Sequence, residues 1–132
     1  MKAMILAAGY GKRLLPLTKD TPKPLLKVGN KTLIERNINN LIKSGFSEIV
    51  INVSHLSKLV EGHVKEKFPK NNISFSFEER PLGTGGGVLK ALNILGSEPF
   101  LLINSDIYHC ISFTNMPKKT EAAHLIGVPN PD

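Results

Sequence analysis

The chain has few of the features that mark several large classes of protein. It contains a single cysteine, Cys110, which excludes an internal disulfide and a cysteine-rich metal site. It has no tryptophan and two tyrosines, and its lysines and arginines do not alternate with aromatic residues as in many single-stranded nucleic-acid binders. It has no run of about 18 apolar residues, the length that a membrane-spanning helix requires. We therefore expect a globular cytoplasmic protein that binds neither nucleic acid nor membrane.

The charge of the chain is unbalanced toward the positive. There are 17 Lys and Arg against 11 Asp and Glu, which gives a net charge of +6, and six of the 17 lie between Lys12 and Lys31. A positive segment of this kind suits an anionic ligand, and phosphorylated small molecules are one such class. The length of 132 residues predicts one domain, residues 1–132, that is large enough to bury its own core.

The apolar pattern alternates between strand and helix periodicity. We expect strands at 3–8, 48–53, 73–77, 99–104 and 122–128, and helices at 31–44, 56–68 and 87–95. This alternation predicts an α/β fold, a Rossmann-like doubly wound domain with a mostly parallel sheet and helices on both faces. Ligands of such sheets bind beyond the carboxyl ends of the strands. The residues that follow the first, third and fourth strands should therefore share one crevice.

The first strand end carries glycines and cations. Gly9 and Gly11 would let backbone N–H groups approach phosphate oxygens, and Arg13 can bind such oxygens through two parallel hydrogen bonds. Lys23 lies between two prolines, which restrict the backbone on either side of it. The spacing matches neither the dinucleotide fingerprint nor a Walker P-loop. A tight turn and a solvated loop lysine are the structural alternatives.

The other two strand ends carry carboxylates. Glu78 ends the third strand and could accept hydrogen bonds from the N–H groups of a base, and three glycines at 85–87 would open a helix and admit a flat ring or a phosphate. Asp106 follows the fourth strand, and one carboxylate among phosphates is a common way to hold Mg²⁺. The alternatives are a surface carboxylate, a loose glycine loop and an Asx turn, respectively.

Three segments resemble one family. MKAMILAAGYGKRLLPLTKDTPKPLL is similar to the signature of the sugar-1-phosphate nucleotidyltransferases, the nucleotide-sugar pyrophosphorylases. ERPLGTGGG and INSD resemble two further segments of that family, in the same order, so the resemblance covers essentially the whole chain. Within the family the sequence is most similar to the N-acetylmuramate-1-phosphate uridylyltransferases, followed by the mannose-1-phosphate guanylyltransferases.

The resemblance implies a reaction and a role for each motif residue. The fold would be that of the nucleotide-diphospho-sugar transferases, and UTP or GTP would react with a sugar 1-phosphate to give a UDP- or GDP-sugar and pyrophosphate. Arg13 would stabilise the leaving pyrophosphate, and Lys23 the α-phosphate and the incoming sugar phosphate. Mg²⁺ would be held by Asp106. The remaining residues would bind the nucleotide: Ala8, Gly9 and Gly11 through their backbone, and Glu78 and Gly83 at the base.

The sequence departs from the family in two ways. Ser105 stands before the metal aspartate, where the family usually has glycine. The sugar-binding residues and a second metal aspartate of the family lie in a distal part, beyond the segments seen here. We therefore expect residues 1–132 to be the nucleotide-binding N-terminal portion of a truncated nucleotidyltransferase domain. A homo-oligomer is one expected state of this protein. The alternative is a non-catalytic nucleotide-binding or oligomerisation module left by truncation.

Overall fold

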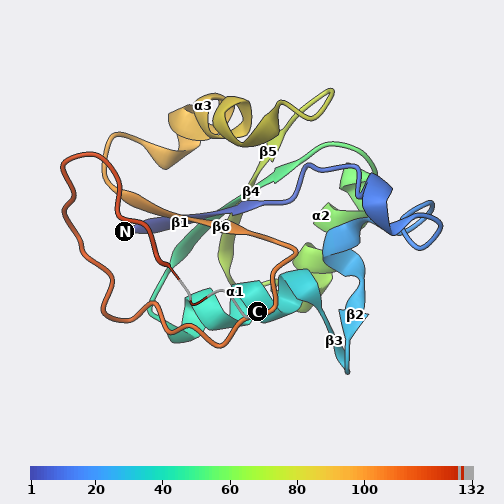
Figure 1. The fold of residues 1–132 in the computed structure, drawn as a ribbon, viewed down its shortest axis with the longest axis horizontal. Coiled ribbons are helices and arrows are strands. Elements are labelled where there is room, and N and C mark those ends of the chain that lie inside the picture. Colours follow the sequence, from blue (N-terminus) through green and yellow to red (C-terminus); the bar gives the residue numbers. More distant parts are fainter. Residues whose placement is uncertain (128, 130–132) are drawn as a thin grey trace.

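A four-stranded parallel sheet forms the centre of the computed structural model, which describes residues 1–127 and 129 (Figure 1). Its strands lie in the order β5–β4–β1–β6, and every neighbouring pair is parallel. The bounds of these strands are β1 Lys2–Leu6, β4 Glu48–Val53, β5 Asn72–Phe77 and β6 Phe100–Asn104. The sheet confirms the predicted fold class and four of the five predicted strands.

Helices cover both faces of this sheet, as predicted. They are α1 Leu33–Lys43, α2 Ser57–Lys67 and α3 Gly83–Leu95. Figure 1 shows α3 on one side of the sheet, whereas α1 and α2 lie on the other. Successive residues of a strand point to opposite faces, so Ile5 packs with α1 and α2 while its neighbour Met4 packs with α3. Both side chains are fully buried. Among the described residues, no helix combines the length and the apolar character that crossing a membrane requires.

Short elements connect β1 to α1. They are the 3-10 helices η1 Lys12–Leu14 and η2 Lys23–Leu25, followed by a small antiparallel pair, β2 Lys27–Val28 and β3 Lys31–Thr32. The sequence pattern did not predict these elements, because each is too short to show a period of its own. They lie within the 26 residues between β1 and α1, which include most of the predicted phosphate-binding segment.

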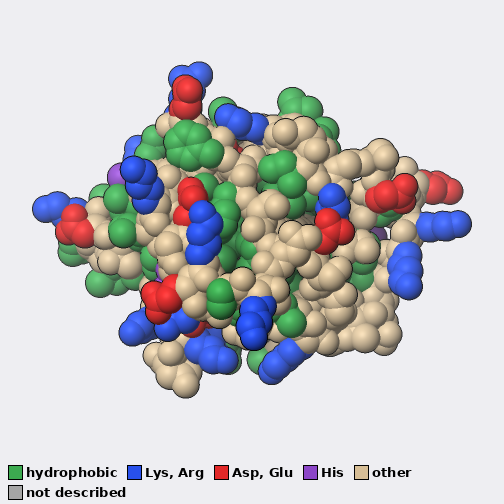
Figure 2. Space-filling model, turned by 180° about the vertical axis from the view of Figure 1, so that it is seen from behind, with side chains coloured by type: hydrophobic (Ala, Val, Ile, Leu, Met, Phe, Trp, Pro, Cys, Tyr) green, Lys and Arg blue, Asp and Glu red, His purple; other side chains and the backbone are tan. Residues whose placement is uncertain are grey.

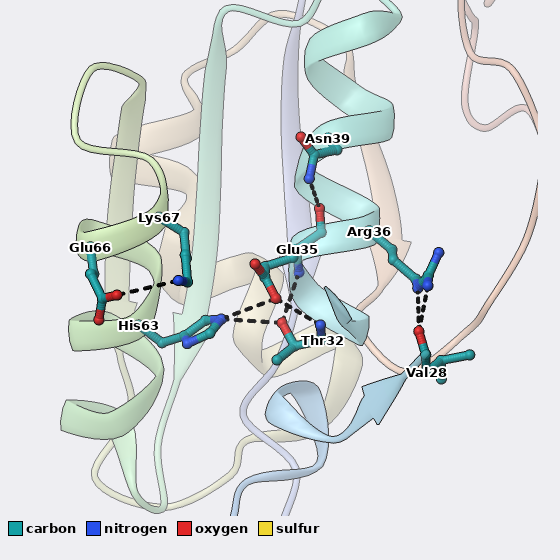
Figure 3. A network of polar contacts seen from close by, with 8 residues as sticks. All are labelled: Val28, Thr32, Glu35, Arg36, Asn39, His63, Glu66 and Lys67. Atoms are coloured by element: carbon teal, nitrogen blue, oxygen red, sulfur yellow. Dashed lines mark hydrogen bonds and ion pairs between the residues drawn. The ribbon is translucent and has the colours of Figure 1, made fainter. Parts of the chain in front are cut away.

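The start of α1 is fixed by side chains and joined to α2 (Figure 3). Thr32 and Glu35 form a capping box, in which the Glu35 N–H donates to Thr32 Oγ1 at 3.2 Å and the Thr32 N–H donates to Glu35 Oε2 at 2.7 Å. His63 of α2 lies 3.2 Å from Thr32 Oγ1 and 3.4 Å from Glu35 Oε2 through its Nε2. This contact links the two helices on the same face of the sheet.

Helix α3 begins four residues earlier than predicted, at Gly83 and not at Gly87. Glycine is a poor helix former, so the sequence predicts that the glycines at 85–87 only open the helix, with a loose loop as the alternative, and predicts no helix before them. In the structure these glycines form the first turns of α3, and Gly87 is buried against the ends of β4 and β5. Close packing on the sheet outweighs the low intrinsic propensity of this segment.

The predicted strand at 122–128 is wrong over residues 122–127, which form no strand, and Val128 lies outside the described residues. Residues 122–127 are exposed, and Leu125 is 88% exposed. A β-branched, apolar run forms a strand only where a partner strand accepts it, and the described part of the sheet pairs with nothing in this segment. After β6 the chain instead crosses α1, where Asn40 Nδ2 donates to the carbonyl of Ile111 at 2.8 Å.

On the face that Figure 2 shows, charged side chains of both signs are spread out rather than collected in one place. Figure 2 shows lysines and arginines set singly among aspartates, glutamates and apolar side chains on the face opposite to that of Figure 1. The net charge of +6 therefore does not by itself mark a binding surface. The site has to be identified from the geometry at the strand ends.

Candidate active site

A cleft of about 420 Å³ lies at the carboxyl edge of the sheet. The residues that line it come from the ends of β1, β4 and β6, from the segment before α1, and from the start of α3. Seven of the eight residues predicted for the site are among them: Ala8, Gly9, Gly11, Arg13, Lys23, Gly83 and Asp106. The structure thus brings together side chains that are up to 98 positions apart in the sequence.

The loop after β1 is shaped by a glycine with a left-handed backbone. Gly11 has a φ of +65°, and a Cβ placed there would lie 3.0 Å from Thr18 Cγ2 and 3.3 Å from Lys23 Cβ. The hydroxyl of the buried Thr18 donates to the Gly11 carbonyl at 2.8 Å, and this hydrogen bond stabilises the turn. Gly9 has no such constraint, since nothing lies within 4 Å of a Cβ at that position. The requirement for glycine in this loop is therefore strict at Gly11.

Lys23 is mounted rigidly, as the flanking prolines predict. Pro22 and Pro24 are buried, and the side chain of Lys23 is 25% exposed. Its Nζ forms an ion pair with Asp106 Oδ2, which joins the segment before α1 to the end of β6. Arg13 lines the same cleft from η1 and is exposed, so its guanidinium has no fixed partner among the described residues. With Lys12, which lines the cleft beside Arg13, three cationic residues and one carboxylate line the cleft.

Ser105 holds the turn that presents Asp106. Its N–H donates to the carbonyl of Leu6 at 3.0 Å, which continues the pairing of β1 and β6 by one residue. Its own carbonyl accepts from Asn37 Nδ2 of α1, also at 3.0 Å. Ser105 is 3% exposed and lines the cleft, so the departure from glycine at this position adds a small side chain to the cleft wall. The backbone there is fully hydrogen-bonded, which orients Asp106.

Glu78 is the one predicted site residue that the structure does not place on the cleft wall. Its side chain is fully buried, and its two carboxylate oxygens accept from Asn52 Nδ2 at 2.7 Å and from the Leu82 N–H at 2.8 Å. Both carboxylate oxygens are thus hydrogen-bonded within the protein, and the expected direct contact with a base stays a prediction. The surface position considered as the alternative is wrong, because helix α3 returns over this strand end and covers Glu78.

Sequence reasoning missed several residues of the cleft. They are Lys12, Asn52, Thr84 and Asn104, together with apolar neighbours. Asn52 and Asn104 were detectable, because each is a polar residue at the carboxyl end of an otherwise apolar strand. Lys12 was noted only as part of the positive segment, and its Nζ lies 5.3 Å from the centre of the Tyr10 ring. Thr84 carries no signal of its own within the glycine run.

A parallel α/β sheet with helices on both faces, and with a glycine-rich cationic cleft at its carboxyl edge, is the architecture of the Rossmann-like nucleotide-diphospho-sugar transferase fold. The model of the nucleotidyl transferase family matches residues 2–128. The chain therefore belongs to the nucleotidyl transferase family.

Named relatives agree with this assignment. An N-acetylmuramate alpha-1-phosphate uridylyltransferase of Neisseria meningitidis is 41% identical over 141 residues, covering 99% of this chain and 60% of the relative. A mannose-1-phosphate guanyltransferase of Schizosaccharomyces pombe is 41% identical over 111 residues, covering 81% of this chain and 31% of the relative. The crystal structure of HddC from Yersinia pseudotuberculosis complexed with GMP-PN matches with a TM-score of 0.71 at 30% identity, covering 80% of this chain and 47% of that one. The chain spans at most 60% of the length of these proteins.

Proposed function

We propose that this chain binds a nucleoside triphosphate, UTP or GTP, with Mg²⁺, and serves as the nucleotide-binding portion of a sugar-1-phosphate nucleotidyltransferase that releases pyrophosphate and forms a nucleotide sugar. The observation that carries the proposal is the convergence of Gly11, Arg13, Lys23 and Asp106 on one cleft at the carboxyl edge of the sheet. Backbone N–H groups, two cations and a carboxylate at such an edge suit a triphosphate with its metal ion. The proposed reaction uses a substrate of the cytoplasm, and we infer that location.

The β1–β6 end of the cleft suits the phosphates. In the proposed reaction an oxygen of the sugar phosphate attacks the α-phosphorus, and pyrophosphate leaves on the opposite side. Such a transfer depends on positioning and on neutralising charge. Lys23 would neutralise the α-phosphate and the incoming phosphate, and Arg13 would bind the leaving pyrophosphate. The backbone of Ala8, Gly9 and Gly11 would line the path between them.

The same end fits a divalent metal ion that is completed by the nucleotide. Within the part of the chain that the structure describes, no three His, Cys, Asp or Glu residues cluster as a self-sufficient metal site. Mg²⁺ usually takes only one or two protein carboxylates and fills its remaining positions with phosphate oxygens and water. Asp106, 31% exposed on the cleft wall, can supply that one carboxylate. The ion would add positive charge to the transferring phosphate.

The names of the relatives favour a catalytic role over that of a purely nucleotide-binding module. They also narrow the choice of nucleotide base. They describe a uridylyltransferase, a guanyltransferase and a complex with GMP-PN. UTP and GTP are therefore the two nucleotides that we propose, with Gly83 at the base end of the cleft. The same names supply the acceptors to test first, which are N-acetylmuramate 1-phosphate and mannose 1-phosphate.

The test is a transfer assay with the chain, each triphosphate and each sugar 1-phosphate, followed by pyrophosphate release. Any release should require both substrates and Mg²⁺. Arg13→Ala and Asp106→Ala should each lower the rate by about 100-fold, as when one preorganised charge contact is lost. A loss of tenfold or less in both variants would contradict the assigned roles. Triphosphate binding without any release would instead identify a non-catalytic nucleotide-binding module.

A further inference from the structure

Two asparagines of helix α1 hold the segment that follows β6, residues 105–111, which we call the exit segment. Asn37 Nδ2 donates to the carbonyl of Ser105 at 3.0 Å, and Asn40 Nδ2 donates to the carbonyl of Ile111 at 2.8 Å. The two asparagines are three positions apart and therefore share one face of α1. The exit segment forms neither helix nor strand, so side chains of α1 supply the hydrogen bonds that a neighbouring strand would otherwise supply.

Asn37 is the more enclosed of the two asparagines, and its amide has one fixed orientation. The residue is 3% exposed, whereas Asn40 is half-buried. Its Nδ2 donates to the carbonyl of Leu33, one turn earlier in α1, at 3.1 Å in addition to the carbonyl of Ser105. Carbonyl oxygens only accept hydrogen bonds, so the nitrogen of the amide has to face both of them. The contact with α1 thus orients the donor that holds Ser105.

The bond from Asn37 fixes the peptide group that joins Ser105 to Asp106. The Ser105 carbonyl and the Asp106 N–H belong to the same planar group. The N–H of Ser105 is also held, because it donates to the carbonyl of Leu6 at 3.0 Å. With Ser105 held on both sides, the plane of the next peptide group determines where the Cα of Asp106 lies. The position of its carboxylate then depends mainly on the torsions of its own side chain.

A second contact from α1 lies on the other side of Asp106. The guanidinium carbon of Arg36 lies 5.3 Å from the centre of the Tyr108 ring, two residues after Asp106. Arg36 Nε also donates to the carbonyl of Val28 at 3.0 Å (Figure 3). Val28 belongs to β2, five residues after Lys23. Helix α1 therefore contacts both of the chain segments that bring Lys23 and Asp106 together.

We propose that Asn37 is a positioning residue for Asp106, and that it determines how strongly the cleft holds Mg²⁺ together with a triphosphate. The inference rests on the proposed function, because it concerns the carboxylate that would hold the metal ion there. Asn37 is not part of the cleft lining, so it acts through the peptide group between Ser105 and Asp106. Replacing a residue that orients a metal ligand from behind typically lowers metal affinity by about 10- to 100-fold. Asn40 holds the exit segment five residues beyond Asp106 and should have no such effect.

The test is the Mg²⁺ effect, the ratio of the affinity measured with Mg²⁺ to the affinity measured without it. Calorimetry gives this ratio for UTP, for GTP and for inorganic tripolyphosphate, which has the phosphates but no base. In Asn37→Ala we expect the Mg²⁺ effect to fall about tenfold, because Asp106 is no longer oriented. The affinity without Mg²⁺ should stay within about twofold of that of the unchanged chain. Equal losses with and without Mg²⁺ would show that Asn37 supports the cleft as a whole, and would overturn the proposed role.

Asn40→Ala is the matched control, since it removes the same kind of bond from the same helix to the exit segment. We expect Asn37→Ala and Asn40→Ala each to lower the melting temperature by about 4 °C or more, but only Asn37→Ala to lower the Mg²⁺ effect. Asn39→Ala removes a bond of 2.7 Å to the Glu35 carbonyl within α1 and should leave the Mg²⁺ effect unchanged. A similar fall in Asn40→Ala would show that lost stability, and not the orientation of Asp106, weakens metal binding.

Asn37→Ser separates the two bonds of the amide, and it covers the case in which Asn37→Ala does not fold. A serine hydroxyl in a helix can donate to the carbonyl four residues earlier, here that of Leu33. The serine side chain is shorter than that of asparagine, so the bond to Ser105 is lost. We expect a smaller loss in melting temperature than in Asn37→Ala, with the same fall in the Mg²⁺ effect. A Mg²⁺ effect equal to that of the unchanged chain would contradict the proposal.

The order of the backbone at Asp106 separates this inference from the proposed function. Relaxation of the ¹⁵N nucleus of Asp106 should give an order parameter of about 0.85 in the unchanged chain and in Asn40→Ala, and of about 0.6 in Asn37→Ala. The same value in all three proteins would overturn the positioning by Asn37. If the unchanged chain binds neither nucleotide nor tripolyphosphate with Mg²⁺, the proposed function fails and the role of Asn37 in metal binding fails with it. The order parameter then still decides whether Asn37 fixes Asp106.

Discussion

Gly11 is the residue whose backbone most tightly constrains the glycine loop. Its φ of +65° and the contact of 3.0 Å that a Cβ would make with Thr18 both exclude other residues. Gly11→Ala should lower the free energy of unfolding by about 2 kcal/mol, measured by urea denaturation. Gly9→Ala, where a Cβ meets nothing within 4 Å, should change it by less than about 0.5 kcal/mol. Equal losses would show that the loop does not depend on this backbone geometry.

We expect the Lys23–Asp106 ion pair to matter for ligand binding more than for the stability of the fold. Their side chains are 25% and 31% exposed, and pairs in contact with water contribute about 1 kcal/mol or less. Lys23→Met and Asp106→Asn should therefore change the free energy of unfolding by less than about 1 kcal/mol. Each should nonetheless lower the affinity for the triphosphate with Mg²⁺ by about tenfold, because a charge contact to the ligand is lost. Large destabilisation with unchanged affinity would reverse this assignment.

The sequence predicted residue types better than residue orientations. Glycines, cations and Asp106 could be assigned to one cleft because parallel strands end at the same edge of a sheet. The orientation of the Glu78 side chain could not be predicted in this way, because it depends on Asn52 of a different strand and on the close approach of α3. Contacts between elements distant in the sequence leave no local pattern to read.

At the scale of elements, α1 depends on its first turn. The Thr32 hydroxyl accepts from the Glu35 N–H at 3.2 Å, and Thr32→Ala should lower the free energy of unfolding by about 1 kcal/mol. Thr32→Ser, which keeps the hydroxyl, is the matched control and should lose less than half as much. Thermal or urea unfolding measures both. A loss in Thr32→Ser as large as in Thr32→Ala would show that the methyl group, and not the cap, stabilises α1.

The same turn makes the stability of the fold depend on pH. Burial alone would raise the pKa of Glu35, but hydrogen bonds from Thr32 and the neighbouring His63 outweigh it and lower the pKa below its ordinary value. The folded state therefore binds this proton less readily than the unfolded state, and the stabilisation present above about pH 4.5 is lost as the pH falls through the lowered value.

Unfolding measured from pH 7 down to pH 3 tests this dependence. The free energy of unfolding should fall below about pH 4.5. In Glu35→Gln, which has no such proton to bind, the fall should be shallower. Identical profiles for the two proteins would show that other carboxylates account for the acid sensitivity.

The sequence predicted element boundaries well where buried residues recur with a regular period. It predicted them wrongly where packing between distant elements determines the secondary structure. The apolar spacing of α1 and the β-branched run of β4 gave elements close to those found. The start of α3 was misplaced because helix propensity favours a loop at 83–86, whereas the sheet beneath supports a helix. The strand at 122–128 failed because strand propensity says nothing of whether a partner strand is present.

For the whole molecule, the cleft joins all four strand ends of the sheet directly or through Glu78. A ligand that binds only the folded state should therefore stabilise the entire fold. At a concentration of about 100 times its dissociation constant, the preferred triphosphate with Mg²⁺ should add about 2.7 kcal/mol to the free energy of unfolding. Asp106→Asn should reduce this gain at the same ligand concentration. A gain that is equal for tripolyphosphate and nucleotide would show that the base site contributes nothing to binding.

The central claim is that a nucleoside triphosphate and its metal ion bind at the carboxyl edge of this sheet. Calorimetric titration of the chain with UTP and GTP, each with and without Mg²⁺, tests it most directly. We predict that one of the two binds preferentially, that Mg²⁺ strengthens its binding, and that Asp106→Asn removes the effect of Mg²⁺ without unfolding the chain. Binding of neither nucleotide, or binding that is indifferent to both Mg²⁺ and Asp106, would contradict the account.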